Sequence, residues 1–500
     1  MDSFTDVSGA YVNEKGLVKR RLSPPRLLIS SALFGVIFTA FFAKQDLGLN
    51  LTIIFLLVYA YEFFNRRLII TKTFRQEKLL YLFTIPTIYL IITLFTFSSM
   101  INVLSVLVIL AVMYVQYVVL SGSALNNWDE GGFFIDMIFA GINRVLFGSI
   151  RFVGDTVSTL FKGKKKAGTL IGVGAGVILL LIVVPLLVGA DANVSDMFGQ
   201  FIDSLALGDV FLYVFLFLLG ASLVTAPAAT ALEPECTGQR KAFYITKRPI
   251  PAVTTGIALS MIAVVYVLFA GVQFRYFFAP QETIANVLGL TSSAYAVRGF
   301  GELIFITCLN FVLIMIAMRF TQQNDGKTPA FLKTLYTLLI AFNFVILASS
   351  HLRMQCYEIS YGYSVARFLS HSFMLLLVIL NAIMLARIFS NKVKLVRLFA
   401  AAALIYFCAV VAVNPESYVA KENIKRYEQT GKIDAEYLFS LSGDALGEAC
   451  DFAVAYPSTF DTVVKQQAEY ELKILERKTG WASLNLADER AKGKLQELLR

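Results

Sequence analysis

The residues that could do chemistry in this sequence are charged or polar side chains at the ends of long apolar stretches. An ionisable group is costly inside a membrane, so such positions are candidate functional sites. Six stand out in the second half of the chain: Arg298, Glu302, Glu358, Tyr361, Arg367 and His371. The arginines could bind an anionic group through charge-assisted hydrogen bonds, with the glutamates orienting them. One hypothesis is therefore a ligand-binding pocket for an anion.

The stretch CYEISYGYSVARF holds three of these side chains. Gly362 permits a tight turn between two apolar segments, and Arg367 and His371 lie four residues apart, on one face of a helix. Glu358 is expected to pair with Arg367 or Arg298, which would compensate the buried charge. The alternative interpretation is structural, with a belt of interfacial tyrosines, one ion pair and a packing histidine.

Motifs of several common site classes are missing from the sequence. There is no G-x-x-x-x-G-K-[ST] and no H-E-x-x-H, which argues against a P-loop ATPase and a zinc protease. The chain has two histidines and five cysteines with no C-x-x-C pair, so we expect no metal site and no cofactor. Cys356 and Cys450 fall on the side predicted to be outside, where a disulfide between them is chemically allowed.

The composition indicates a membrane protein. Of 500 residues, 57% are hydrophobic and 16% are charged, the mean hydropathy is +0.68, and soluble chains carry roughly 25% charged residues. Apolar runs of about 17 to 25 residues suit helices that cross a core of ~30 Å, and they are too continuous for barrel strands. Eleven such spans are predicted, near residues 26–43, 48–64, 79–97, 101–121, 168–189, 209–226, 251–271, 300–320, 330–350, 363–387 and 394–413.

The predicted fold class is all-α: a polytopic transmembrane bundle of about eleven spans with a small α-helical C-terminal extramembrane domain. Its predicted segments are 1–25 (cytoplasmic N-terminal segment), 26–121 (spans 1–4), 122–167 (cytoplasmic amphipathic interfacial segment), 168–413 (spans 5–11) and 414–500 (helical C-terminal domain). A pore-lining or re-entrant helix is the alternative for the third of these segments.

Lysine and arginine in alternate loops set the predicted orientation. Basic residues gather before the first span, after the second and fourth, and in every second loop from there on, whereas 190–209 has four aspartates and no Lys or Arg. The N-terminus is therefore predicted to be cytoplasmic and the C-terminal domain extracytoplasmic. The net charge of +9 is accounted for by this bias and by anionic membrane lipids, and we expect no nucleic-acid partner.

The fifth predicted span opens with glycines at helical spacing, Gly168, Gly172 and Gly176. Small residues repeated every four positions let another helix approach closely. These residues are therefore predicted to pack against a second helix, either within the chain or in a second copy as a homo-oligomer.

Several stretches resemble a bacterial polytopic membrane-protein family known only as a domain of unknown function. They are YAVRGFGEL, YEISYGYSVARF, NPESYVAKENIKRYEQTGKIDAEYLFSLSGDA and WASLNLADERA, all within residues 290–500. The family's Tyr-Gly-x-[ST]-x-x-Arg turn matches Tyr361, Gly362 and Arg367, and its Asn-Pro helical C-terminal tail begins here at Asn414. The resemblance implies a fold type and the bacterial plasma (inner) membrane, and it implies no activity.

The motifs and the ionisable residues gather at the outer ends of spans eight to eleven, so we expect the C-terminal domain to dock over them. Three functions fit. The first is a non-enzymatic scaffold or sensor that binds lipid, an envelope component or a partner protein at the outer face. The second is a secondary transporter, although no internal symmetry is visible. The third is a membrane enzyme acting on lipid-linked substrates, with a glutamate as base.

Overall fold

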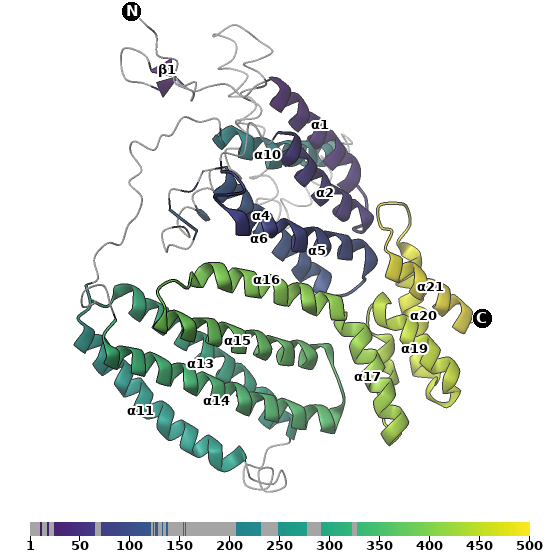
Figure 1. Cartoon of the computed structure of the whole chain (residues 1–500). Coiled ribbons are helices and arrows are strands. Elements are labelled where there is room, and N and C mark those ends of the chain that lie inside the picture. Colours follow the sequence, from purple (N-terminus) through teal and green to yellow (C-terminus); the bar gives the residue numbers. More distant parts are fainter. Residues whose placement is uncertain are drawn as a thin grey trace, which may run out of the picture. The chain divides into compact units, whose positions relative to one another are not determined.

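The structure is a computed structural model of the whole chain (Figure 1). It describes residues 11–12, 18–19, 25–65, 72–121, 207–231, 249–277, 292–322 and 328–500, together with single positions between 124 and 156. Apart from a hairpin of two short antiparallel strands, β1 (Tyr11–Val12) and β2 (Val18–Lys19), the elements in these ranges are helices. The predicted all-α class is confirmed for this part of the chain.

The chain divides into two compact units. The first contains residues 1–96, 102–243 and 476–486. Its helices are α1 (Pro25–Phe42), α2 (Leu49–Phe64), α4 (Lys78–Leu82), α5 (Thr84–Thr96), α6 (Ile101–Leu120) and α10 (Leu207–Ala231).

Helices α1 and α10 approach each other closely through glycine. A Cβ at Gly35 would lie 2.7 Å from the Phe217 carbonyl oxygen, and one at Gly220 would lie 2.6 Å from the Phe38 Cβ. This is the small-residue packing that membrane helices favour. The glycines predicted to play that part, Gly168, Gly172 and Gly176, lie outside the described residues.

The second unit contains residues 97–101, 244–475 and 487–500. Its bundle helices are α11 (Ala252–Phe277), α13 (Ser292–Phe320), α14 (Ala330–Tyr361), α15 (Val365–Phe389) and α16 (Leu395–Val413). They are followed by α17 (Pro415–Thr430), α18 (Ala435–Phe439), α19 (Gly443–Ala455), the 3₁₀ turn η2 (Pro457–Thr459), α20 (Thr462–Arg477) and α21 (Leu486–Leu498).

Seven helices of the described ranges are long and apolar enough to cross a membrane, which indicates a multi-pass membrane protein. They are Pro25–Phe42, Lys78–Thr96, Ile101–Leu120, Ala252–Gly271, Ala330–Ile359, Val365–Phe389 and Leu395–Val413. Three of the other predicted spans coincide with shorter apolar helices, Leu49–Phe64, Phe211–Val224 and Ile304–Phe320. The remaining one, 168–189, lies outside the described residues.

A row of buried amides joins four helices of the second unit. The Tyr266 hydroxyl donates to the Asn310 side-chain oxygen (2.7 Å), Asn310 donates to Asn343 (2.6 Å), and Asn343 donates to Asn381 (3.0 Å). Asn381 in turn donates to the Leu377 carbonyl at 2.8 Å. All three asparagines are fully buried, and each amide is satisfied by its neighbours, which removes the penalty of burying it.

The residues after Val413 form a helical domain with a core of its own. Its buried side chains include Val419, Phe439, Leu446 and Phe452, contributed by three helices. Positive-φ residues bound its first helix, since Asn414 precedes α17 with φ 54° and Gly431 ends it with φ 68°.

Candidate functional site

The turn between α14 and α15 is built around Gly362. This residue has φ 83° and ψ −174°, a conformation open almost only to glycine. Its amide donates to the Glu358 carbonyl at 2.8 Å, which ends α14. The Ser364 hydroxyl then caps α15 by accepting from the Arg367 amide at 3.4 Å. The predicted tight turn is confirmed.

The Arg367 side chain folds back over this turn. Its Nη1 donates to the Gly362 carbonyl, and its guanidinium lies 3.9 Å from the centre of the Tyr357 ring, in cation–π contact. Its Nε is buried with no hydrogen-bond partner among the described residues. Arg367 therefore stabilises the turn, with one donor left buried and unsatisfied by the described residues.

The two histidines of the chain meet on adjacent helices. The Nδ1 atoms of His351 (α14) and His371 (α15) are 3.0 Å apart, and the His351 Nε2 lies 3.0 Å from the Gln355 amide nitrogen. The His371 Nε2 lies 3.1 Å from a carboxylate oxygen of Glu358, without the alignment of a hydrogen bond. The two groups are therefore in contact without a hydrogen bond, and they form an ion pair when the imidazole is protonated.

These contacts correct two predictions. Glu358 lies beside His371, while the Arg367 guanidinium is used by Gly362 and Tyr357, so of the two expected partners Arg367 is not the one found. The side chain of the other, Arg298, is outside the described residues. The loop expected after residue 350 is helical, because α14 continues to Tyr361. That extension places His351 on a helix, facing the next helix of the bundle.

The other predicted site residues divide into two groups. Tyr361 is 53% exposed and packs edge-to-face against Tyr357 with ring centres 5.1 Å apart, as an interfacial aromatic does. Arg298 and Glu302 lie in α13, but their side chains are outside the described residues. Among the described residues, no group of three or more His, Cys, Asp or Glu side chains is placed to hold a metal ion.

The C-terminal domain is attached to the α14–α15 turn by polar contacts. Asn423 of α17 makes a reciprocal pair with the Tyr363 backbone: its side-chain oxygen accepts from the Tyr363 amide (3.0 Å), and its nitrogen donates to the Tyr363 carbonyl (2.9 Å). The Tyr437 hydroxyl accepts from the Val365 amide at 3.2 Å, and burial raises the pKa of this phenol. The expected docking of the domain on the turn is confirmed.

Apolar side chains complete this attachment. The Phe368 ring of α15 lies 5.1 Å from the Tyr418 ring of α17, and Tyr363, Val365 and Phe368 pack against the core of the C-terminal domain. The turn and the domain therefore form one packed body within the second unit.

The Asn-Pro start of α17 carries a buried carboxylate, Glu416, that is 2% exposed. One oxygen accepts from the Ser99 hydroxyl (3.1 Å) and the Met100 amide (3.0 Å); the other accepts from the Ser442 amide (2.8 Å) and the Ser442 hydroxyl. Glu416 lies in the first turn of α17, where the helix dipole favours a negative charge. Four donors and the helix end thus hold this charge in place.

A second carboxylate, Asp444 in the first turn of α19, is less well compensated. It accepts from the Ser98 amide at 2.8 Å. Burial nevertheless raises its pKa to about 6, and the nearby charges of Glu416 and Asp488 act in the same direction. Asp444 is therefore a titratable group outside the spans.

The stretch WASLNL makes its contacts in the first unit. The Trp481 ring lies 4.8 Å from the Phe41 ring, the carbonyls of Ala482 and Leu484 accept from the amides that begin α2, and Asn485 donates to the Leu94 carbonyl. A Cβ at Gly48 would lie 2.6 Å from the Ser483 backbone. This motif is a structural joint.

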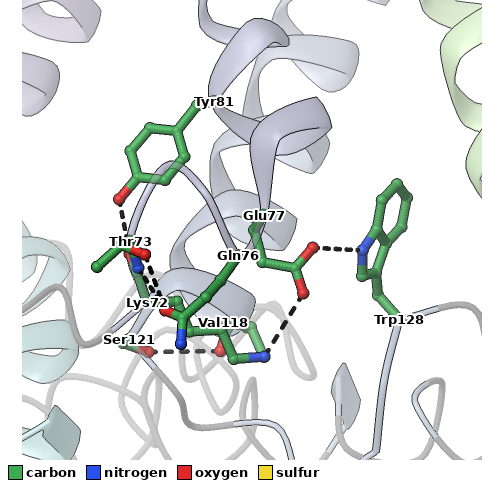
Figure 2. Close-up of polar contacts among 8 residues, drawn as sticks. All are labelled: Lys72, Thr73, Gln76, Glu77, Tyr81, Val118, Ser121 and Trp128. Carbon is green, nitrogen blue, oxygen red and sulfur yellow. Dashed lines mark hydrogen bonds and ion pairs between the residues drawn. The ribbon is translucent and has the colours of Figure 1, made fainter.

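A polar cluster in the first unit fixes the loop before α4 (Figure 2). The Glu77 carboxylate accepts from the Trp128 indole at 3.1 Å and lies 3.7 Å from the Lys72 ammonium. The Tyr81 hydroxyl donates to the Lys72 carbonyl, and the Gln76 side chain accepts from the Thr73 amide. Because the groups satisfy one another, the cluster is structural.

The sequence left open a disulfide between Cys356 and Cys450; it does not form, because Cys450 is a free thiol in the core of the C-terminal domain. Sequence reasoning also missed His351, Asn423 and Glu416 as members of these clusters. The scarcity of histidine was a usable signal for the first, since both copies flank one predicted turn. The asparagine and the glutamate looked like ordinary residues of a charged helix.

Comparison with protein families matches residues 83–450 to a domain of unknown function, DUF4153. The chain belongs to this family. The resemblance to a family of unknown function had been placed on residues 290–500, whereas the DUF4153 match begins near α5 and ends within α19. It contains the turn and Glu416 but not Trp481. No curated protein and no solved structure matches the chain.

Proposed function

We propose that this DUF4153 protein is a non-enzymatic scaffold or sensor of the bacterial plasma membrane. Its C-terminal domain is the binding head, on the extracytoplasmic side, and its N-terminus is cytoplasmic. The charge distribution in the second unit supports this orientation. At the bundle end away from the C-terminal domain, the described charged residues are all basic: Arg319, Lys333, Arg387, Lys392, Lys394 and Arg397. The positive-inside rule assigns that end to the cytoplasm.

Helix lengths support about eleven spans. At 1.5 Å per residue, α10 is about 38 Å long and α13 about 44 Å, both sufficient for a core of ~30 Å. Helix α2, with 16 residues, is about 24 Å long and would cross with local thinning of the bilayer. Together with the seven long apolar helices and the predicted span 168–189, these three helices account for the eleven predicted spans.

The observation that carries the proposal is the attachment of the C-terminal domain to the α14–α15 turn. Asn423, Tyr437 and the Phe368–Tyr418 contact join an extramembrane domain to the end of a transmembrane hairpin. A ligand that shifts such a domain must also shift the hairpin, as a sensor requires. The positive charge of the Arg367 guanidinium supports an anionic group as one ligand, from a lipid or an envelope component.

The first experiment tests the side of the membrane. Cys450 is only 3% exposed, so its protection from a maleimide would not report topology. Ser458→Cys, at an exposed position of η2 in an otherwise cysteine-free chain, should react with a membrane-impermeant maleimide in intact cells. A variant that keeps only Cys236, in a predicted cytoplasmic loop, should react only after permeabilisation. The opposite pattern would overturn the assignment of the binding head.

The second experiment tests for a partner. A photo-crosslinking amino acid at Tyr470, which is 58% exposed on α20, should give an adduct with an envelope component in intact cells. The matched control is Ile405, 66% exposed on the transmembrane helix α16, which should crosslink only to lipid. Identical adducts at both positions would contradict a binding head.

A secondary transporter is the second candidate, because the His351–His371 pair is a titratable group within the candidate spans. Solute flux in proteoliposomes that requires a proton gradient would favour it. No solute flux would leave the scaffold or sensor as the better account.

A further inference from the structure

We propose that His351, His371 and Glu358 form a proton-binding site, and that its protonation alters how the α14–α15 turn holds the C-terminal domain. His371 joins the three side chains: its Nδ1 lies 3.0 Å from the His351 Nδ1, and its Nε2 lies 3.1 Å from a Glu358 carboxylate oxygen. The three residues come from two neighbouring helices. They include every histidine of the chain. The effect on the domain rests on the proposed function, whereas the proton site itself does not.

When both imidazoles are neutral, the hydrogen-bond partners determine which ring nitrogen of each histidine carries the proton. The Gln355 amide nitrogen can only donate, so the facing His351 Nε2 must accept and its proton must lie on Nδ1. That proton points at the His371 Nδ1, which must therefore accept, leaving the His371 proton on Nε2 beside Glu358. The neutral pair is thus a single donor chain whose last N–H group, on the His371 Nε2, lies beside the Glu358 carboxylate without hydrogen-bonding to it.

One added proton reverses this chain without breaking it. Protonated His371 carries hydrogens on both ring nitrogens, so its Nδ1 donates to His351 and its Nε2 forms an ion pair with Glu358. The His351 proton then moves to Nε2, and the Gln355 amide turns to present its oxygen. The first proton is consequently stabilised by both Glu358 and His351.

A second proton cannot be bound without breaking the contact between the two imidazoles. With both imidazoles charged, two N–H groups and two positive charges would face each other across the 3.0 Å contact. The two rings must then separate, through rotation of the exposed His351 side chain or a shift of α14 against α15. Two coupled protons thus give two distinct steps, a first that tightens the contact and a second that opens it.

The surrounding charges come from each element packed against the pair. Helix α14 carries Arg353 as well as Glu358, α15 carries Arg367, and α16 contributes the Tyr406 hydroxyl, bonded to Ser372. From α17, Glu422 acts with Glu358 to raise the pKa of the Tyr363 hydroxyl, and Arg426 acts against them. Helix α13 carries Arg298 and Glu302, whose side chains are outside the described residues.

The route from the site to the C-terminal domain is short. The Glu358 carbonyl accepts the Gly362 amide, and the next residue, Tyr363, is held by both groups of the Asn423 side chain. A shift of Glu358 toward or away from His371 therefore acts on the same turn that anchors the domain.

The test uses the full chain in lipid nanodiscs, grown with ¹⁵N-labelled histidine so that only two imidazoles give signals. We expect two titration steps separated by at least about one pH unit, because the sites are coupled. Glu358→Gln should weaken binding of the first proton about tenfold, while Glu428→Gln, at an exposed position of α17, should not. Two independent titrations that Glu358→Gln leaves unchanged would overturn the proton site.

The second readout is hydrogen exchange in α17, corrected for the intrinsic effect of pH. Its protection should change across the second titration step in the wild type and in Glu428→Gln, and should not change there in His371→Gln. Unchanged α17 protection with coupled titration would overturn the link to the domain and keep the proton site. Failure of the Ser458→Cys topology test would instead overturn the proposed function alone.

Discussion

Two carboxylates of the second unit, Glu416 and Glu358, are both largely buried and yet serve opposite purposes. Glu416 receives four hydrogen bonds from groups that do not titrate, three of them from Ser99, Met100 and the Ser442 amide at 2.8 to 3.1 Å. Glu358 instead faces the imidazole of His371 at 3.1 Å. A carboxylate saturated with fixed donors is a structural anchor, whereas one whose partner gains and loses a proton is a switch.

The largest expected effect is that of Glu416→Ala. It leaves four donors facing a cavity, so the C-terminal domain should lose about 3 to 5 kcal/mol of stability. Glu416→Gln keeps one acceptor oxygen and should recover part of that loss. Native-state hydrogen exchange of α19 measures both values.

The matched control is Glu428→Gln on the same helix, where the side chain is exposed and the change should be below about 0.5 kcal/mol. Glu358→Gln should cost less stability than Glu416→Ala and should alter the histidine titration. If Glu358→Gln destabilised the domain as much as Glu416→Ala, the distinction between anchor and switch would fail.

The next effect concerns the turn that joins the switch to the domain. Gly362→Ala introduces a Cβ at 2.9 Å from the Asn423 oxygen, in a backbone conformation open almost only to glycine. It should cost about 2 to 4 kcal/mol and loosen α17. Gly431→Ala is the control, because it has positive φ but nothing within 4 Å, so only about 1 kcal/mol is expected. Equal losses in thermal unfolding would contradict the role of the Asn423 contact.

Asp444 has fewer fixed donors than Glu416 and, among the described residues, no titratable partner like that of Glu358, and it gives a prediction of how stability depends on pH. Its pKa is raised to about 6 from 3.8 by burial, so the folded state binds the proton more tightly than the unfolded state. The stabilisation is full below about pH 4 and is lost as the pH rises through 6, which amounts to about 3 kcal/mol. Asp444→Asn should remove this slope from the exchange-derived stability, and Glu428→Gln should keep it.

The smallest effect is expected at Cys450. Burial raises the pKa of this thiol to about 12, so its reaction with a maleimide should require opening of the domain. Labelling should therefore be slow in the wild type and faster in Glu416→Ala, in proportion to the loss of stability. A rate equal in both variants would show that the thiol is reached without opening.

The membrane class and the turn could be predicted from sequence because each depends on local pattern. Runs of apolar residues identify spans, and a glycine between Tyr361 and Tyr363 in a polar stretch identifies the turn. The end of α14 could not be predicted, because the polar residues 351–361 interrupt hydropathy without interrupting the helix. For the same reason, His351 was assigned to a loop.

The clusters themselves depend on contacts between distant segments. Glu416 and Ser99 are 317 residues apart in sequence, and Asn485 and Leu94 are 391 apart. Each looks unremarkable in its own helix or loop, so neither periodicity nor composition marks it. The Glu358–His371 pair was not among the pairings that the sequence suggested, since the helix rotation that selects it is set by packing.

The row of amides from Tyr266 to Asn381 constrains how the bundle can move. Each asparagine reaches its neighbour only at one relative height, and a slide by one helical turn, 5.4 Å, would separate every donor from its acceptor at once. The hydrogen bonds therefore fix the positions of α11, α13, α14 and α15 along their axes relative to one another, near the middle of each helix. The bonds constrain sliding along the helix axes more than tilting about mid-height, so tilting is the relative motion that this row would least oppose.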